Sequence, residues 1–221
     1  MPPKPRSQEG IQRDKQRIID AALDIVHEKG LEKLSIRKLS ARLDMSATNI
    51  YNYFYNKDEI YLHILINGFE KIQEFHREAL EGVEAPAEQL EIYLRCLCRF
   101  WKEYPAYYQL MFSTEDPKCM DYIGTPIEEL AKQEKENAME SYYLLRDIIS
   151  RCSPELGEKA LDITTVRIVS EIHGFINLCH NNIMRELGAD PYVIIDDLLE
   201  HIISPLCGFE YKCTDSRTGQ Y

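Results

Sequence analysis

Residues Ser35–Tyr61, SIRKLSARLDMSATNIYNYFYNKDEIY, contain the clearest structural pattern in the chain. The pattern predicts two very short helices joined by a tight turn and followed by a longer helix. Leu39 and Leu43 form an apolar pair four residues apart in the first short helix, and Ile50 and Phe54 do the same in the second. On spacing alone, an ordinary corner between two helices remains an alternative.

Residues that favour helix ends separate these segments. Ser35 and Ser46 can each accept a hydrogen bond from the first turn of a short helix. Asp44 lies where the chain must turn, and Asp tolerates the left-handed backbone conformation better than most residues. Asn56, with Glu59 three residues later, is typical of a capping box at the start of the longer helix. These capping and turn residues therefore favour a helix-turn-helix.

An ordered set of motifs between Ile18 and about Leu65 resembles the N-terminal DNA-binding domain of TetR-family transcriptional repressors. The matching elements are IIDAAL at 18–23, GL at 30–31, SIRKLS at 35–40, MS at 45–46, IYNYF at 50–54 and KDEI at 57–60. The cluster Tyr-x-Tyr-Phe-x-x-Lys is specific to that family. Many members have Ala-Gly in the turn, where this chain has Leu43-Asp44. The turn is therefore the place where the match departs from the family pattern.

The resemblance implies that the helix starting at Ala47 enters the DNA major groove. The amide of Asn49 can pair bidentately with adenine, and Thr48 can meet a thymine methyl group or a phosphate. Nearby phenolic and cationic groups suit contacts to the DNA backbone. For the two charged residues in the set, a solvated surface position is the alternative. The predicted DNA-binding residues are Ser35, Arg37, Ala47, Thr48, Asn49, Tyr51, Asn52, Tyr53 and Lys57.

Charge is distributed unevenly along the chain. Its 221 residues have a formal net charge of -11, which by itself argues against a nucleic-acid-binding protein. Residues 1–57, however, hold 11 Lys and Arg against 7 Asp and Glu, a net charge of +4; residues 58–221 hold 15 against 30, a net charge of -15. A basic head on an acidic body can bind DNA locally, and we expect salt-sensitive binding that needs two heads acting together. Chance surface patterning is the alternative.

Composition excludes several other classes. No apolar run approaches the roughly 18 to 20 residues of a membrane span, and the N-terminus lacks the apolar segment of a secretory signal. Seven irregularly spaced cysteines favour reduced thiols in the cytoplasm. No phosphate-binding glycine loop, nucleophile elbow or zinc-protease motif is present, so neither an enzyme nor a cofactor is predicted. His173 and His180 could share a helical face, but without a matching cysteine or carboxylate set no metal site is predicted.

Helical patterns cover nearly the whole chain, so the predicted fold is all-α with about nine helices. An N-terminal three-helix helix-turn-helix domain is followed by a larger C-terminal helical domain for ligand binding and dimerisation. One long helix is expected at about 154–186 and a last one at about 191–203. The expected segments are a flexible arm at 1–11, the DNA-binding domain at 12–57, a connecting helix at 58–80, the sensing and dimerisation domain at 81–207 and a tail at 208–221.

The C-terminal body resembles the sensing domain of the same family through YPAYYQLMF at 104–112 and EIHGF at 171–175. The resemblance implies a homodimer in which the helices around 161–187 and 192–206 pair with their two-fold mates as a four-helix bundle. Gly174 suits a close helix crossing, and packing within one subunit is the alternative. Apolar contact area is expected from Ile168, Ile172, Phe175, Ile176, Val193, Ile194, Leu198, Leu199, Ile202 and Ile203.

A small-molecule site is expected where aromatic and polar side chains of the sensing domain converge. An apolar cavity with a few polar groups is what a drug-sized ligand needs, although an aromatic stripe at helical spacing is often plain core. The predicted ligand-binding residues are Trp101, Tyr104, Tyr107, Tyr108, Met111, Phe112, Tyr142, Tyr143, Arg146, Ser170, Gly174, Asn177 and Asn181.

Together these patterns predict a sequence-specific DNA-binding regulator, a repressor that a small apolar or aromatic inducer releases from a double-stranded DNA operator. The half-sites are expected about one DNA turn or slightly more apart, ~34 Å or beyond. The alternative is an all-helical small-molecule or lipid-binding protein, or an enzyme, without DNA binding.

Overall fold

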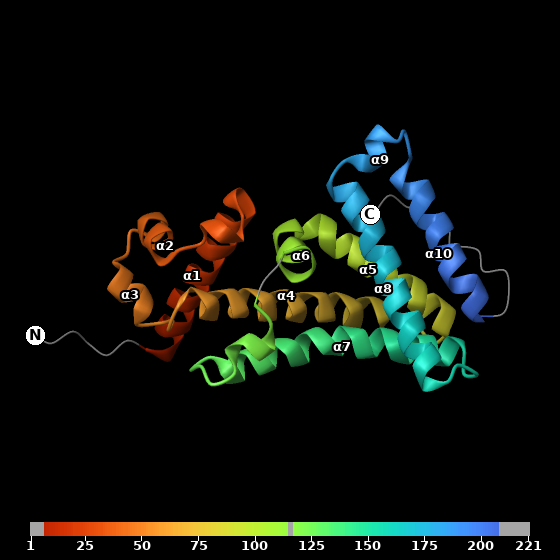
Figure 1. Cartoon of the computed structure of the whole chain (residues 1–221), viewed down its shortest axis with the longest axis horizontal. Coiled ribbons are helices and arrows are strands. Elements are labelled where there is room, and N and C mark those ends of the chain that lie inside the picture. Colours follow the sequence, from red (N-terminus) through yellow and green to blue (C-terminus); the bar gives the residue numbers. More distant parts are fainter. Residues whose placement is uncertain (1–6, 115–116, 208–221) are drawn as a thin grey trace, which may run out of the picture. The chain divides into compact units, whose positions relative to one another are not determined.

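The computed structural model describes residues 7–114 and 117–207, and helices are the only regular secondary structure in these ranges (Figure 1). This confirms the all-α prediction. Across the same residues, none of the helices combines the length and apolar character needed to cross a bilayer. The helices are α1 (Gln8–Lys29), α2 (Ile36–Leu43), α3 (Ala47–Tyr51), α4 (Lys57–Leu80), α5 (Pro86–Glu103), α6 (Pro105–Phe112), α7 (Glu128–Cys152), α8 (Glu158–His180), α9 (Ile183–Glu186) and α10 (Pro191–Cys207), with short 3-10 turns η1 (Leu31–Lys33) and η2 (Cys119–Tyr122).

Side-chain caps fix the starts of the helices in the N-terminal region. Ser35 and Ser46 each accept a hydrogen bond from the backbone N–H three residues on, at 3.3 and 3.1 Å. Asn56 caps α4 in the same way at 2.8 Å. Between α2 and α3, Asp44 has a left-handed backbone with φ of 53°. These four positions confirm the predicted caps and turn of the helix-turn-helix.

Two helix boundaries differ from the sequence-based expectation. The side chain of Ser7 accepts a hydrogen bond from the backbone N–H of Gly10, so α1 starts at Gln8 inside the expected flexible arm. The expected long helix at 154–186 is wrong, because α8 ends at His180 and Asn182 takes a left-handed φ of 59° before α9. Residues 1–6 of the expected arm and the expected tail at 208–221 lie outside the described residues.

The chain forms two compact units, and each unit is built from two separate stretches of sequence. Unit 1 comprises residues 1–71 and 104–138, and unit 2 comprises residues 72–103 and 139–221. The helices α4 and α7 therefore contribute to both units. This division places α6 with the DNA-binding helices, whereas the sequence pattern assigned it to a sensing domain at 81–207.

In unit 1, α6 packs closely against α4 and also contacts α1. A β-carbon at Gly68 would lie 2.6 Å from Met111 Sδ and 3.0 Å from Tyr107 Cδ1, so any larger residue would force these side chains of α6 to shift away from α4. One residue on, the rings of Phe69 and Phe112 meet edge to face with centroids 6.0 Å apart. These aromatic residues of α6 therefore serve as packing groups between helices.

In unit 2, α5, α8 and α10 pack against one another around a buried ion pair. The guanidinium of Arg95 lies 2.7 Å from Glu91 on the same helix and 2.6 Å from Asp196 on α10. Arg95 and Glu91 are buried. A buried charge costs several kcal/mol unless it is paired, so this cluster fixes how α10 sits on α5.

Candidate functional site

The short helix α3 presents most of its side chains to solvent. Ile50 is fully buried and anchors the helix, whereas Ala47 and Thr48 are exposed and Tyr51 is 55% exposed. Asn52, directly after the helix, is exposed as well. Such small, amide and phenolic groups contribute little to the core of unit 1. They are free to meet base edges and phosphates in a groove, as the sequence predicts for a recognition helix.

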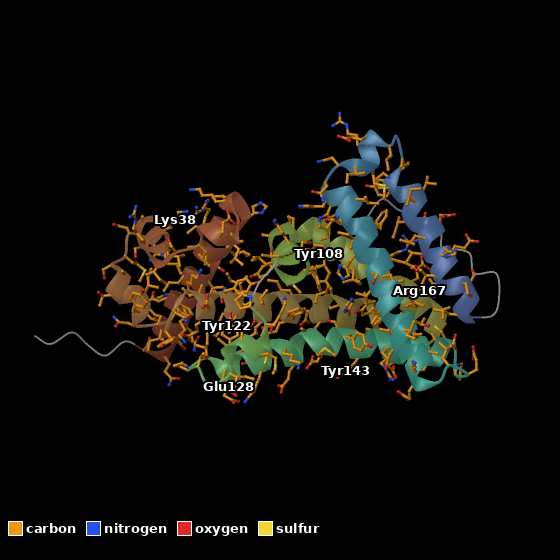
Figure 2. The ribbon with its side chains drawn as sticks, in the orientation of Figure 1. Lys38, Tyr108, Tyr122, Glu128, Tyr143 and Arg167 are labelled. Carbon is orange, nitrogen blue, oxygen red and sulfur yellow. The ribbon has the colours of Figure 1, made fainter. Side chains whose placement is uncertain are left out.

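Cationic side chains flank this helix. Arg37 on α2 and Lys57 at the start of α4 are exposed, and within the described part of the chain neither forms an ion pair. Lys38, which sequence reasoning did not select, is exposed beside Arg37 on α2 (Figure 2). Its position directly after Arg37, a predicted phosphate-binding residue, could have identified Lys38 from the sequence. Ser35 and Asn49 are half-buried, and both take part in the helix caps described above.

Arg42 differs from these cations because its charge is already compensated. Its guanidinium lies 2.8 Å from Glu28 and 3.1 Å from Asp24, both on α1. The hydrogen bond to Arg42 lowers the pKa of Glu28 and raises that of Arg42. Arg42 therefore ties α2 to α1, and the cations available for phosphate contacts are those without such partners.

Tyr53 does not have the exposed position that a phosphate-binding phenol needs. Its side chain is buried, and its hydroxyl donates a hydrogen bond to Asp14 Oδ2 on α1 at 2.6 Å. The ring thus closes the base of the helix-turn-helix, unlike Tyr51 two residues earlier. Of the predicted DNA-binding residues, Tyr53 is the one that the structure directs into the core.

We therefore expect Tyr53→Phe to lower the free energy of unfolding by about 1 to 2 kcal/mol, because it removes a hydrogen bond to a charged group without changing ring packing. DNA affinity is expected to stay within about twofold. Urea unfolding and a fluorescence-anisotropy titration with operator DNA measure the two quantities. A large loss of DNA affinity with unchanged stability would restore Tyr53 as a DNA contact.

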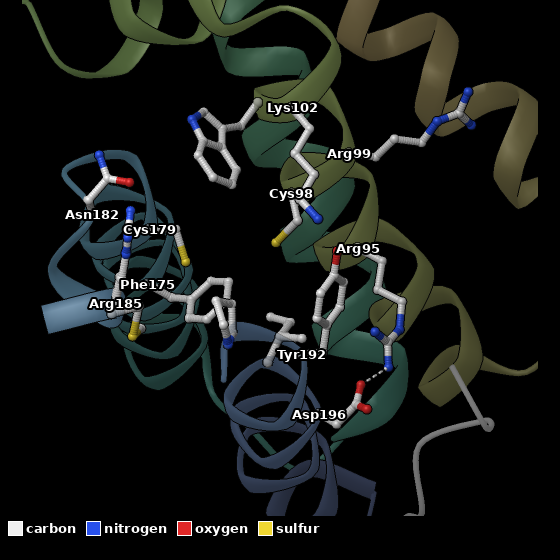
Figure 3. A pocket seen from close by; sticks show the side chains of 14 residues that line it. Arg95, Cys98, Arg99, Lys102, Phe175, Cys179, Asn182, Arg185, Tyr192 and Asp196 are labelled. Carbon is white, nitrogen blue, oxygen red and sulfur yellow. Dashed lines mark hydrogen bonds and ion pairs between the residues drawn. The ribbon is translucent and has the colours of Figure 1, made fainter. Parts of the chain in front are cut away.

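A cavity of about 250 Å³ lies in unit 2 among α5, α8, α9 and α10 (Figure 3). Trp101, Phe175 and Tyr192 supply aromatic surface to it. Lys102 and Arg185 supply positive charge. The indole N–H of Trp101 donates to His180 Nδ1 at 3.3 Å, which orients the ring at the end of α5. Burial raises the pKa of Cys98, another lining residue, to about 12, so its thiol is neutral.

The predicted ligand-binding residues are not brought together by the structure. Trp101 alone among them lines the cavity. Tyr107 and Tyr108 are buried in unit 1, and the ring of Tyr104 receives the ammonium of Lys71 at 5.1 Å. Met111 and Phe112 pack against α4 as described above.

The remaining predicted ligand residues lie on α7 and α8. Tyr143 is exposed, and Tyr142 contacts it edge to face. Arg146 is paired with Asp162 at 2.7 Å and with Glu158, so it joins α7 to α8. None of the last four lines the cavity: Ser170, Gly174 and Asn177 are exposed on α8, and Asn181 is exposed directly after its last residue.

Most of the residues that build the cavity were missed because they share no local motif. They come from α5, α8, α9 and α10 and from the break at Asn182, where the sequence pattern predicted an uninterrupted helix. No group of three or more histidine, cysteine or acidic side chains in the described ranges is arranged to hold a metal ion.

The apolar residues expected at a dimer interface also need correction. Seven of them are buried within the subunit: Ile168, Ile172, Phe175, Ile176, Leu199, Ile202 and Ile203. Of the other three, Val193 and Ile194 on α10 are exposed as expected and Leu198 is half-buried. The exposed apolar residues that were not predicted are Ile163 and Val166 on α8 and Tyr192 on α10. Apolar side chains lie on more than one face of α8, so their spacing alone did not show which of them pack within the subunit.

The capped helix-turn-helix with an exposed second helix defines a DNA-binding transcriptional regulator. Residues 18–64 match the family model for bacterial regulatory proteins of the tetR family. The match covers the helix-turn-helix and the start of α4, so this segment of the chain is a DNA-binding region of the TetR type. Among curated proteins, no sequence matches the chain significantly.

Solved structures show the same fold over most of the chain. The regulatory protein SCO4313 has a TM-score of 0.73 at 17% identity, covering 91% of this chain and 100% of that chain. A TetR-family regulator from Bordetella parapertussis gives 0.64 at 18% identity, covering 87% and 95%. A fatty acid degradation regulator from Bacillus halodurans gives 0.61 at 15% identity, covering 90% and 97%. The helical fold of both units is therefore shared with these proteins.

Proposed function

We propose that the protein is a homodimeric repressor, acting in the cytoplasm, that a small molecule binding in the unit 2 cavity releases from its operator. The observation that supports this proposal most is the chain connection between cavity and DNA-binding head. Trp101 and Lys102 line the cavity in the last turn of α5, and a single residue, Tyr104, separates α5 from α6. The helix α6 in turn packs on α1 and α4.

This arrangement suits a population shift. A ligand that favours one position of the end of α5 also biases α6 through the Tyr104 junction, and with it the angle of the α1–α4 head. Two heads of a dimer whose spacing no longer matches successive grooves lose the benefit of binding together. The ligand needs no contact with DNA for this effect.

Dimerisation is proposed to use the outward faces of α8 and α10. Ile163 and Val166 are 60% and 56% exposed, and Val193 on α10 is 64% exposed. A β-carbon at Gly174 would meet nothing within 4 Å apart from its own turn of α8, which leaves room for a second copy. Exposed apolar side chains of this size on neighbouring helices are typical of a subunit interface.

Val166→Glu is therefore expected to weaken self-association at least tenfold, because a two-fold interface would bury two new carboxylates. Light scattering coupled to size-exclusion chromatography measures the change. Met120→Glu, at another exposed apolar position in η2, is the matched control. A Val166→Glu protein that remains a dimer would exclude this face as the interface.

The proposed function is tested by selecting DNA fragments that the full-length protein retains, followed by footprinting. We expect a two-fold symmetric site with half-sites at least about one DNA turn apart, ~34 Å, and affinity that falls steeply with salt. Addition of a cavity-binding molecule is expected to release the DNA. Retention of no DNA at low salt, or a site contacted by one subunit only, would contradict the proposal.

A further inference from the structure

The charges around the unit 2 cavity are unevenly compensated. Five charged side chains line it: Arg95, Arg99, Lys102, Arg185 and Asp196. Asp196 accepts from Arg95 at 2.6 Å, and Arg95 also pairs with a second carboxylate, so this group is fully paired.

Arg99 is compensated as well. Its Nε lies 2.6 Å from Glu103, and its guanidinium stacks over the Phe75 ring at 4.7 Å from the centroid. Figure 3 shows that the Arg99 side chain turns away from the cavity. Its charge therefore does not face the cavity.

Lys102 and Arg185 remain. Neither forms an ion pair with any residue in the described part of the chain. The ammonium of Lys102 lies over the Tyr192 ring at 4.8 Å from the centroid, and Figure 3 shows it extending toward the cavity. Both residues are exposed and so lie at the mouth of the cavity, whereas Phe175, Met184 and Ile195 in its wall are buried.

This distribution is amphipathic: an apolar interior beneath two uncompensated positive charges. Residues 58–221 have a net charge of -15, so two cations without acidic partners at one opening are a local exception. At physiological ionic strength, surrounding surface carboxylates are largely screened beyond about 8 Å, so the local pair of cations dominates at the opening. A neutral ligand would gain nothing from these charges, and a cationic one would be repelled.

Resting on the proposed function of this cavity as the effector site, we propose that it binds a small amphipathic carboxylate. The apolar body lies against Phe175, Met184 and Ile195, and the carboxylate lies between Lys102 and Arg185. The cavity volume of about 250 Å³ suits a compact acid with a short chain or a single ring. Guanidinium and ammonium groups form charge-assisted hydrogen bonds with such a head group.

Trp101 makes this testable in the intact protein, because it is the one tryptophan in the chain and lines the cavity. Three probes share one apolar tail and differ in head-group charge: octanoate, octanamide and octylamine. In intrinsic-fluorescence titrations, confirmed by calorimetry, we expect octanoate to bind saturably and at least about tenfold more tightly than octanamide. Octylamine is expected to bind more weakly still.

Substitutions assign the effect to the two cations. Lys102→Gln and Arg185→Gln are each expected to weaken octanoate binding about fivefold or more and to leave octanamide binding unchanged. Lys159→Gln, an equal charge change at an exposed position on α8, is the control and should leave both unchanged. Equal affinity for octanoate and octanamide, or no saturable octanoate signal, would overturn the ligand class. Full octanoate affinity in a variant that carries both Lys102→Gln and Arg185→Gln would overturn it as well.

The same probes separate this inference from the proposed function. Octanoate binding that depends on Lys102 and Arg185 but leaves the operator complex intact would support the ligand class and refute release through this cavity. Release of operator by octanamide as readily as by octanoate would refute the ligand class while supporting the repressor.

Discussion

Replacing Asn49 and Tyr51 together by alanine is expected to weaken operator binding by at least about 100-fold. A bidentate amide contact to a base contributes roughly 1 to 3 kcal/mol, and a dimer would lose it in both subunits. Tyr51 is 55% exposed on α3, so its removal takes away a phosphate contact without opening a hole in the core. Anisotropy titrations against operator and against unrelated DNA measure both losses.

The pattern of the loss distinguishes the two side chains. Asn49→Ala alone should reduce discrimination between operator and unrelated DNA, whereas Tyr51→Ala alone should weaken both about equally. Asn49 also lies in the first turn of α3, but Ser46 caps its backbone N–H, so the substitution leaves the cap in place.

The matched control for this experiment is the pair Gln133→Ala and Tyr143→Ala on α7. Both control residues are exposed, and they repeat the loss of one amide and one phenol away from α3. Equal effects of the two pairs would show that α3 is not the reading helix. Circular dichroism and the urea midpoint check that each variant stays folded.

What the sequence could predict was the local structure. The caps at Ser35, Ser46 and Asn56 and the left-handed turn at Asp44 depend on residues three or four apart, and all four are confirmed. The exposure of α3 follows from the same local pattern, because Ile50 alone in that helix is buried. Hydrogen bonds within one turn are decided by neighbours, so no tertiary information was needed.

Features that depend on long-range packing were not predictable in the same way. Tyr53 and Tyr51 have identical side chains two residues apart, and only the position of Asp14 on α1 decides that Tyr53 is the buried one. The aromatic residues of α6 suggested a pocket, but the absence of a side chain at Gly68 lets α6 pack directly onto α4. A periodic apolar stripe shows that a face is covered without showing what covers it.

The cavity depends on long-range packing more than any other feature of the fold. Trp101 and Tyr192 are far apart in sequence, and the break at Asn182 that shapes one wall has no proline or glycine to announce it. The same packing has a mechanistic consequence: the division of the fold leaves α6 with the DNA-binding helices. The junction at Tyr104 is therefore the shortest covalent route from the cavity lining on α5 to the head.

Stability is expected to fall as the pH drops from about 6.5 toward 4, because His76 is buried and His173 half-buried in unit 2, both in the neutral form. Burial lowers the pKa of both His76 and His173 from 6.5 to about 4. His76 is 1% exposed and stacks on Tyr93 with ring centroids 4.1 Å apart. The nearby backbone of Tyr93 opposes the shift, but neither ring nitrogen reaches hydrogen-bond geometry with a partner in the described residues.

Stability falls with pH because the two histidines take up protons on unfolding. Between pH 6.5 and 4 the unfolded chain binds protons that the folded protein excludes, so each histidine favours unfolding increasingly as the pH falls. This loss of stability is negligible well above pH 6.5 and amounts to about 2 kcal/mol for the buried His76 at pH 5, and to less for the half-buried His173. It reaches its limit below the folded-state pKa.

We therefore expect His76→Phe to remove about 2 kcal/mol of the stability lost between pH 7 and pH 5, since phenylalanine keeps the stacking and has no proton to gain. Urea unfolding followed by Trp101 fluorescence reports unit 2, which contains both residues. His201→Phe, at an exposed position on α10, is the control for the change in residue type. Carboxylates titrate equally in the variants and cancel in the difference. If His76→Phe loses as much stability as the unchanged protein over this range, the His76 ring is protonated or hydrated in the folded state.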